Sequence, residues 1–229
     1  MTDTGSVWAV VPVKPFRVAK ARLRTALGAA ERAQLARVMV EDVLGALDAS
    51  RHVLAGVIVL TTDDEAAAIA RDHRALVIDE AAPAGINAAI GRALDYLALA
   101  EGGAGRLQET GMLVVPADLP HVSVAAVERI VGLLDAPRAV AIVPATSDRG
   151  TNLLACRPAG VIPPSFGPYS FDRHCEAARQ AGVTPTILTW ADLGRDVDRP
   201  EDLAAFLSLG TATRTHAFLS SLGRAALTP

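Results

Sequence analysis

The sequence has little cysteine, few aromatic residues and no excess of basic charge. Its two cysteines, Cys156 and Cys175, match neither a metal-binding spacing nor a disulfide framework, so both are expected to be reduced thiols. Aromatic residues make up 4% of the 229 residues, and 22 Lys and Arg stand against 25 Asp and Glu. This balance argues against a nucleic-acid partner, which needs a broad basic face, but allows a local basic site for a small anion.

Long apolar runs, targeting signals and two familiar nucleotide-binding motifs are also missing. Every apolar run is far shorter than the ~20 residues of a membrane span. The N-terminal stretch MTDTGSVWAVVPVK contains an early acid and no basic region, so no signal peptide is expected. No Walker-type Gly-Lys-Ser/Thr loop is present, and no GxGxxG follows the first apolar run. We therefore expect a soluble cytoplasmic protein that is neither a P-loop nor a dinucleotide-binding protein.

Short apolar runs rich in β-branched residues alternate with helical patterns up to residue 145. The predicted strands lie at 7–13, 55–63, 75–80, 111–119 and 139–145, and the predicted helices at 30–50, 64–73, 85–100 and 123–136. This alternation is typical of an α/β protein with a parallel, doubly wound sheet. A turn at Gly85–Asn87 opens the third helix, and Ser123 is expected to cap the fourth.

The remainder is richer in Gly, Pro, Ser and Thr. It predicts a short strand at 151–156, a helix at 170–182, a last strand at 184–190 and a last helix at 199–210. Ser170 is expected as an N-cap, Gly182 as a helix stop and Pro200 in a first turn. Because no repeat or linker appears, residues 1–209 are interpreted as one domain. Residues 210–229 form a tail of unknown role that looks helical but loosely anchored.

Polar side chains follow the predicted strands, at the sheet edge where open parallel sheets bind ligands. In chain order they are Lys14, Lys20 and Arg22; Thr61, Thr62 and Asp63; Asp79 and Glu80; Asp118; Asp148, Thr151 and Asn152; and Asp196 and Asp198. Oxygen ligands without His or Cys suit Mg²⁺, so Asp118, Asp196 and Asp198 are candidate Mg²⁺ ligands. The three basic side chains of the first loop suit a polyphosphate.

Each of these residues has a structural alternative. Asp118 could be a turn or capping acid, and Asp196 or Asp198 could cap the following helix. The basic residues of the first loop could form a solvated face. The convergence of all of them on one edge favours a binding site.

Six stretches together resemble a known family: VVPVKPFRVAKARL, GINAAI, VVPADLP, RGTNLLACRP, FGPYSFDRHCEAA and RDVDRPEDLAAFL. They are similar to the guanylyltransferases of coenzyme F420 biosynthesis, which activate 2-phospho-L-lactate or a related phosphorylated acid with GTP. The resemblance runs from about Val7 to about Leu207. RGTN and FGPYSF are its specific part, whereas PADLP and DVD are shared with many sugar-phosphate nucleotidyltransferases.

The resemblance implies a Rossmann-like nucleotidyltransferase fold, with a mostly parallel sheet flanked by helices. It implies that the three acids hold Mg²⁺ and that Thr151, Gly167 and Ser170 bind the acceptor phosphate. A helix N-terminus at Ser170 suits phosphate, and Gly167 allows close approach of the backbone. The alternative is that this loop is a Gly/Pro surface turn.

The predicted reaction transfers GMP from GTP to a phosphorylated small carboxylic acid and releases pyrophosphate. The first loop lacks the glycine-rich pattern of better-known sugar nucleotidyltransferases, so Lys14, Lys20 and Arg22 are expected to bind the triphosphate and to act as the catalytic cations. Gly85 and Asn87 are placed at the base or acceptor end of the cleft.

The sequence does not decide which phosphorylated acid is the acceptor or which oligomer the protein forms. The candidate acceptors are phosphoenolpyruvate, 2-phospho-L-lactate and 3-phospho-D-glycerate. The small or apolar Ala88, Ala89 and Ile90 offer no partner for an extra hydroxyl, which favours the first two. The alternatives are a cytidylyl- or uridylyltransferase for another phosphorylated metabolite and a non-catalytic nucleotide-binding regulator. A homodimer is one option for the assembly, and no membrane partner is expected.

Overall fold

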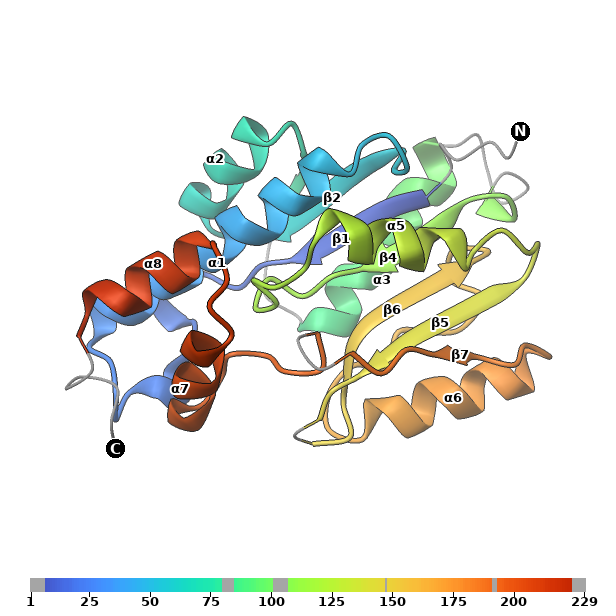
Figure 1. Cartoon of the computed structure of the whole chain (residues 1–229). Coiled ribbons are helices and arrows are strands. Elements are labelled where there is room, and N and C mark those ends of the chain that lie inside the picture. Colours follow the sequence, from blue (N-terminus) through green and yellow to red (C-terminus); the bar gives the residue numbers. More distant parts are fainter. Residues whose placement is uncertain (1–6, 80–84, 101–106, 147, 191–192, 224–229) are drawn as a thin grey trace.

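A seven-stranded sheet in the order β3-β2-β1-β4-β6-β5-β7 forms the centre of the computed structural model (Figure 1). The structure describes residues 7–79, 85–100, 107–146, 148–190 and 193–223. The strands are β1 (Val7–Pro12), β2 (Gly56–Thr61), β3 (Leu76–Asp79), β4 (Gly111–Val114), β5 (Ala139–Pro144), β6 (Thr151–Arg157) and β7 (Thr186–Ile187). Glu80 and the first six residues, which the sequence interpretation used, lie outside the described part.

Helices connect these strands as the alternating pattern predicts. They are α1 (Ala29–Ala49), α2 (Asp64–Asp72), α3 (Ile86–Ala100), α5 (Val124–Gly132), α6 (Ser170–Gln180), α7 (Pro200–Ser208) and α8 (Arg214–Ser221). Two short 3-10 turns, η2 (Phe16–Val18) and η3 (Ala21–Leu23), follow β1. No helix in the described ranges is long and apolar enough to cross a membrane.

The sheet is parallel except for β6, which runs antiparallel to β4 and to β5. The mostly parallel sheet is thus confirmed. The direction of β6 follows from the chain, because only residues 145–150 separate it from β5, and a parallel crossover needs about a dozen residues. The reversal places Thr151, at the start of β6, on the same edge as the carboxyl ends of β4 and β5.

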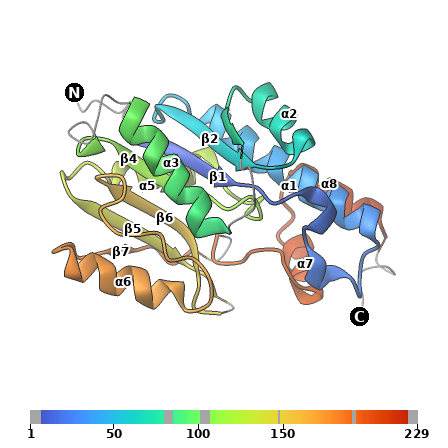
Figure 2. The same ribbon diagram turned by 180° about the vertical axis from the view of Figure 1, so that it is seen from behind.

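Helices cover both faces of the sheet, and alternate strand residues supply the two cores. On β1, Ala9 and Val11 face the core under α1, α2 and α5, whereas Val10 faces the core under α3 and α6. The second face is seen in Figure 2, where α3 lies in front of the strands. Cys156 and Cys175 belong to this second core as buried free thiols, as expected. Period-two burial on both faces explains the continuous apolar runs of the sequence.

Several predicted helix signals are present, but one is wrong. The Ser123 hydroxyl accepts a hydrogen bond from the Ala126 N–H and so caps α5. Pro200 begins α7, and Gly182 follows α6 with a φ of 74°. Ser170 is not the N-cap of α6, because Tyr169 takes that position with a φ of 58° and α6 begins at Ser170.

The C-terminal helix α8 is helical, as predicted, but it is firmly anchored rather than loose. It lies beside α1 and α7 (Figure 1). Leu219 is buried in a third core with Leu23, Leu35 and Phe206. The first turn of α8 is capped from α1, because the Asp42 carboxylate accepts the N–H groups of Arg214 and Thr215 at 2.9 and 2.8 Å. The acid that interrupts the apolar stripe of α1 thus has a structural role.

Removing this cap is expected to destabilise the protein. Asp42→Ala leaves two helix N–H groups without a charged acceptor, which should lower the free energy of unfolding by about 1–3 kcal/mol. Urea denaturation measures the change. Glu41→Ala, which removes only a partly exposed ion pair to Arg214 at 3.5 Å, is the control and should cost no more than about 1 kcal/mol. Equal losses in the two variants would contradict the capping role.

Candidate active site

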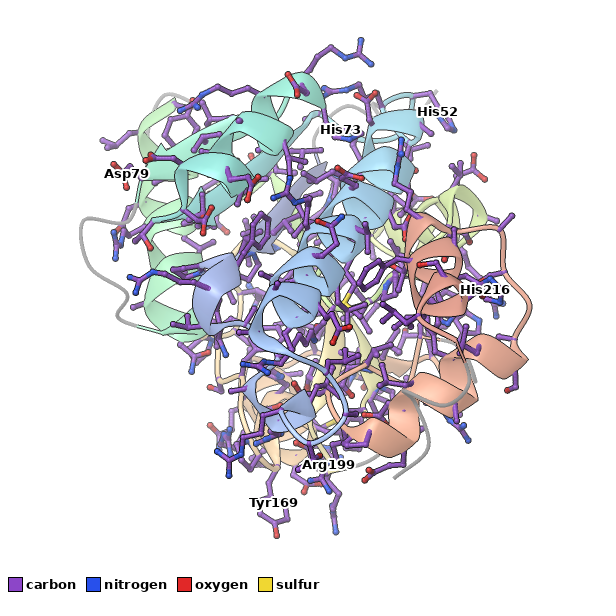
Figure 3. The ribbon with its side chains drawn as sticks, turned by 90° about the vertical axis from the view of Figure 1, so that its left-hand side faces the viewer. His52, His73, Asp79, Tyr169, Arg199 and His216 are labelled. Atoms are coloured by element: carbon purple, nitrogen blue, oxygen red, sulfur yellow. The ribbon has the colours of Figure 1, made fainter. Side chains whose placement is uncertain are left out.

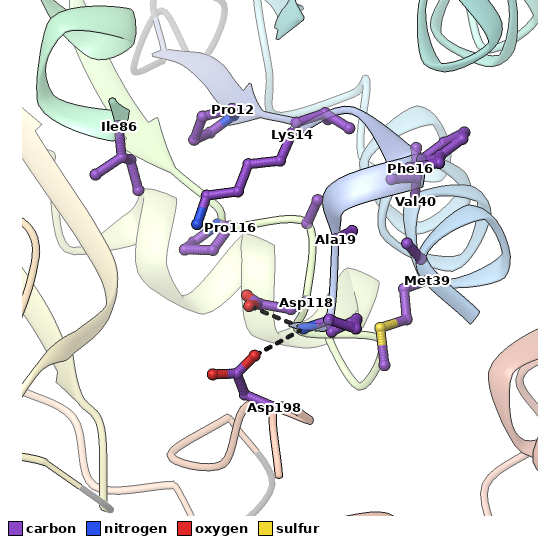
Figure 4. A pocket seen from close by; sticks show the side chains of 14 residues that line it. Pro12, Lys14, Phe16, Ala19, Met39, Val40, Ile86, Pro116, Asp118 and Asp198 are labelled. Carbon is purple, nitrogen blue, oxygen red and sulfur yellow. Dashed lines mark hydrogen bonds and ion pairs between the residues drawn. The ribbon is translucent and has the colours of Figure 1, made fainter. Parts of the chain in front are cut away.

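A cavity of about 190 Å³ opens where the order of the sheet reverses, between the carboxyl ends of β1 and β4. Open α/β sheets bind ligands at such a switch point. Its lining combines apolar side chains with the charged side chains of Lys14, Lys20, Asp118 and Asp198, and Figure 4 shows Asp118 and Asp198 side by side below Lys14. Lys14 extends from the end of β1 over the cavity towards Pro116. The first loop and two of the predicted acids thus meet at one site.

Lys20 holds the two acids together. Its ammonium lies 3.1 Å from Asp118 Oδ2 and 4.0 Å from Asp198 Oδ1, and its side chain is only 7% exposed. Burial raises the pKa of Asp118, but the charge and hydrogen bond of Lys20 outweigh it, so the pKa lies below the usual 3.8. Arg22 binds the other oxygen of Asp198 at 2.7 Å from an exposed position. The basic residues of the first loop therefore do not all form a solvated face.

Asp196 does not line the main cavity, but the charge of Asp118 acts on it. It lines a small recess with His121 and Phe206 instead of the main cavity. Its pKa is raised to about 6, first by burial and then by the negative charge of Asp118. Neither Asp196 nor Asp198 caps α7, because Arg199 is its N-cap and the Asp202 carboxylate accepts the Arg199 N–H. The capping alternative for these two acids is therefore wrong.

The three acids, Asp118, Asp196 and Asp198, supply the oxygen donors that Mg²⁺ prefers, but they do not surround one point in this structure. Within the described ranges, no three Asp, Glu, His or Cys side chains surround one point as metal ligands. Lys20 takes the position of a cation between Asp118 and Asp198, whereas burial and then the charge of Asp118 raise the pKa of Asp196. All-oxygen donors of this kind suit a hard divalent cation. Mg²⁺ binding by Asp118, Asp196 and Asp198 stays a prediction.

Backbone hydrogen bonds fix the segment that carries Asp196 and Asp198. The buried Asn152 side chain donates to Leu193 O at 2.8 Å, and the N–H and hydroxyl of Thr146 both donate to Gly194 O. A Cβ on Gly194 would lie 2.9 Å from Thr146 Cγ2 and from Trp190 O, so the close approach requires glycine. The ends of β5 and β6 thereby position the acids.

A half-buried carboxylate fixes the first loop in turn. Asp63, at the end of β2, accepts the Phe16 N–H at 2.9 Å and also caps α2 through the N–H groups of Glu65 and Ala66. The loop from Lys14 to Lys20 is therefore tied to the neighbouring strand, and Lys20 itself adopts a left-handed φ of 54°. Asp63 thus supports the cationic side of the cavity without lining it.

The predicted acceptor residues form a second group that does not line the main cavity. Thr151 Oγ1 lies 2.9 Å from His174 Nδ1, and both side chains are buried. Gly167 has a φ of 125°, and its O accepts the Ser170 N–H at 3.0 Å. The Ser170 hydroxyl is fully buried without a hydrogen-bond partner. Thr151 and Ser170 are linked indirectly. Thr151 contacts His174, which lies one helical turn after Ser170 on α6.

The Asn87 amide binds the loop before α6, and its expected place at the base or acceptor end of the cleft stays a prediction. Its Nδ2 donates to Phe166 O at 3.1 Å, and its Oδ1 accepts the Phe166 N–H at 2.7 Å. Gly85 begins the same turn with a φ of 88°. The loop continues to Tyr169, which projects from the surface with 62% of its area exposed (Figure 3).

The expected contact of α3 with the acceptor carbons is wrong for two residues. Ala89 and Ile90 are buried in the core beneath the sheet, and Ile86 lines the cavity instead. Helical periodicity explains the error, because residues three and four apart share the core-facing stripe. The preference for two of the three acceptors therefore loses its basis. His174 was missed altogether, although a histidine on the otherwise apolar face of α6 is a usable signal.

His174 is expected to make stability depend on pH. Burial, and then the charge of Arg173, lower its pKa from 6.5 to about 4. The unfolded chain therefore takes up a proton before the folded protein does, and the free energy of unfolding should fall by about 3 kcal/mol as the pH drops from 6.5 to 4. Urea denaturation at a series of pH values should show this slope flattened in His174→Gln and retained in His52→Gln. Parallel curves for wild type and His174→Gln would contradict it.

The sheet order, the switch-point cavity and the flanking helices define a Rossmann-like α/β fold with a candidate ligand site. Among solved structures, the chain is similar to a protein from Desulfovibrio desulfuricans G20 described as a nucleotide-diphospho-sugar transferase. The TM-score is 0.77 at 18% identity, and 97% of each chain is covered. The chain belongs to the family described as "Guanylyl transferase CofC like", whose model matches residues 7–227. This match extends through α8, beyond the end of the resemblance at Leu207.

Curated relatives with three different names align over most of the chain. A phosphoenolpyruvate guanylyltransferase from Conexibacter woesei is 37% identical, covering 96% of this chain and 97% of its own. A 2-phospho-L-lactate guanylyltransferase from Methanothermobacter thermautotrophicus is 31% identical, with 93% and 90% covered. A 3-phospho-D-glycerate guanylyltransferase from Phenylobacterium zucineum is 34% identical, with 93% and 95% covered.

Proposed function

We propose that the protein transfers GMP from GTP to a phosphorylated small carboxylic acid, with release of pyrophosphate, in coenzyme F420 biosynthesis. The observation that carries the proposal is the cavity at the switch point, where Lys14 and Lys20 face Asp118 and Asp198. The family match and the named relatives supply guanylyl transfer and the class of acceptor.

The chain's own residues position the reactants and offset their charge. An oxygen of the acceptor phosphate attacks the α-phosphorus of GTP, a new P–O bond forms, and the bond to the β-phosphate oxygen breaks to release pyrophosphate. Because phosphate is already a nucleophile, positioning and charge neutralisation suffice. Lys14, Lys20 and Arg22 offset the charge of the triphosphate and of the leaving pyrophosphate.

Mg²⁺ would be held by Asp118, Asp196 and Asp198, and when bound it would neutralise phosphate charge and polarise the reacting phosphoryl group. Lys20 lies between Asp118 and Asp198, so its ammonium and a bound Mg²⁺ would compete for these two carboxylates. Thr151, Gly167 and Ser170 are proposed to bind the acceptor, and Asn87 to hold the loop that presents Gly167.

Pyrophosphate release with GTP and each of the three candidate acids tests the proposal. We expect release with at least one acid, dependent on Mg²⁺, and little release when CTP or UTP replaces GTP. A faster reaction with CTP or UTP would favour the cytidylyl- or uridylyltransferase alternative. GTP binding without turnover of any acceptor would favour a nucleotide-binding regulator.

A further inference from the structure

His174 lies at the junction of α6, β6 and the loop before α6, and both of its ring nitrogens are engaged. Its Nε2 lies 2.9 Å from the Ser165 main-chain nitrogen, and its Nδ1 lies 2.9 Å from Thr151 Oγ1. The ring packs edge-on against Phe166, with a centroid separation of 5.1 Å. The side chain therefore contacts the predicted acceptor residue Thr151 and the loop that carries Gly167.

The contacts of the ring assign its proton. A main-chain N–H can only donate, so Nε2 must accept the bond from Ser165, and the proton of the neutral imidazole lies on Nδ1. Nδ1–H then donates to Thr151 Oγ1. An imidazolium would direct an N–H at the N–H of Ser165, and the low pKa of His174, about 4, agrees with a neutral ring.

This assignment leaves two donors unused. Since Thr151 Oγ1 accepts from the imidazole, its own O–H can donate, and no other group in the described part of the chain receives it. In the loop, His174 engages the Ser165 N–H and Asn87 the Phe166 N–H. The next N–H, of Gly167, has no partner among the described residues.

We propose that His174 is a positioning residue for the acceptor: its Nδ1–H fixes the Thr151 hydroxyl as a donor to the acceptor anion, and its Nε2 fixes the loop so that the Gly167 N–H stays available. The proposal rests on the proposed function for the identity of the ligand. It predicts that His174 affects binding of the acceptor and not of GTP, whose charged site lies at the other group of residues.

Steady-state kinetics of a double-mutant cycle test the link between His174 and Thr151. Thr151→Val and His174→Gln should each raise the KM of the best acceptor by about tenfold to a hundredfold, the loss expected for a hydrogen bond to a charged group. The KM for GTP should change less than twofold. The double variant should resemble Thr151→Val, because the two side chains act through one donor. Additive effects, or an equal rise in the KM for GTP, would overturn the proposal.

Two further variants separate positioning from loss of folding. Asn places an amide nitrogen near the position of Nδ1, whereas Gln places its amide near Nε2. His174→Asn should therefore keep an acceptor KM closer to wild type than His174→Gln, and the reverse order counts against the proposal. His52→Gln, on an exposed histidine, serves as the control and should leave both KM values unchanged.

An NMR experiment reads the same contact without any turnover. In protein labelled with ¹⁵N-histidine, the His174 ring should be neutral with its proton on Nδ1 at pH 7, and Thr151→Val should shift the Nδ1 signal. A proton on Nε2, or a charged ring, would overturn the proposal even in an active enzyme. If instead no acceptor is turned over while the NMR result holds, the proposed function fails and the positioning contact stands.

Discussion

Asp118→Asn is expected to lower turnover by more than a hundredfold while the protein stays folded. Asp118 faces the cavity and pairs with Lys20 at 3.1 Å, so the change removes one negative charge from the centre of the site. The amide keeps an oxygen that can accept from Lys20, which limits the loss of packing. Losing one carboxylate that holds Mg²⁺ should raise the barrier by about 3 kcal/mol or more. Initial rates of pyrophosphate release at saturating substrates and Mg²⁺ measure this effect.

The matched control is Asp135→Asn, on an exposed acid at the opposite edge of the sheet. It should leave the rate unchanged, and Asp198→Asn should behave like Asp118→Asn because Asp198 shares Lys20. Urea midpoints for all three variants show whether folding is intact. A folded Asp118→Asn protein with a near-normal rate would show that Asp118 is only a turn or capping acid.

Lys20→Met should also lower turnover by more than a hundredfold and yet bind Mg²⁺ more tightly in the absence of nucleotide. The methionine keeps the apolar stem but removes the ammonium that now offsets Asp118 and Asp198. Without it, only Lys14 and Arg22 of the first loop would offset the triphosphate charge. The affinity for Mg²⁺ should rise by about tenfold or more, because a unit charge about 4 Å away acts with up to about 4 kcal/mol at an effective dielectric constant of about 20 and tenfold needs only about 1.4 kcal/mol. Isothermal titration measures the affinity, and the pyrophosphate assay measures the rate.

Opposite changes in the two quantities distinguish this role from a structural one. A general collapse of the site would weaken both Mg²⁺ binding and turnover. Lys20→Arg keeps the charge and should recover part of the rate. Arg24→Met, which removes an exposed charge from the same segment, is the control and should change neither quantity. Weaker Mg²⁺ binding by a folded Lys20→Met protein would show that the acids do not hold the metal.

The sheet and its helices could be predicted because local patterns determine them. β1 and β2 are buried on both faces, and α5 and α7 carry their signals at Ser123 and Pro200. The direction of β6 could have been inferred too, since its six-residue connection cannot cross the sheet. The start of α6 could not, because the positive φ of Tyr169 is set by the loop around Gly167 and not by a capping side chain.

The candidate site was predictable in its residue types and less so in its contacts. The rule for parallel sheets correctly placed Lys14, Lys20, Asp118 and Asp198 at one edge. Lys20 stands between two acids that follow it by 98 and 178 positions along the chain, a contact that no local pattern records. No sequence motif indicates that Asn87 pairs with Phe166 or that His174 pairs with Thr151.

The third core also determines when, during synthesis, the site can assemble. Leu23 and Leu27, directly after the cationic loop, pack with Val197 and Leu203 beside the acids and with Leu219 of α8. Domains emerge from the ribosome N-terminus first, at about 5–20 residues per second. The cationic loop is therefore synthesised well before Val197, α7 and α8, and it lacks these partners until they leave the ribosome. The growing chain can form much of its sheet early, but the site is complete only after α7 and α8 have packed against the loop.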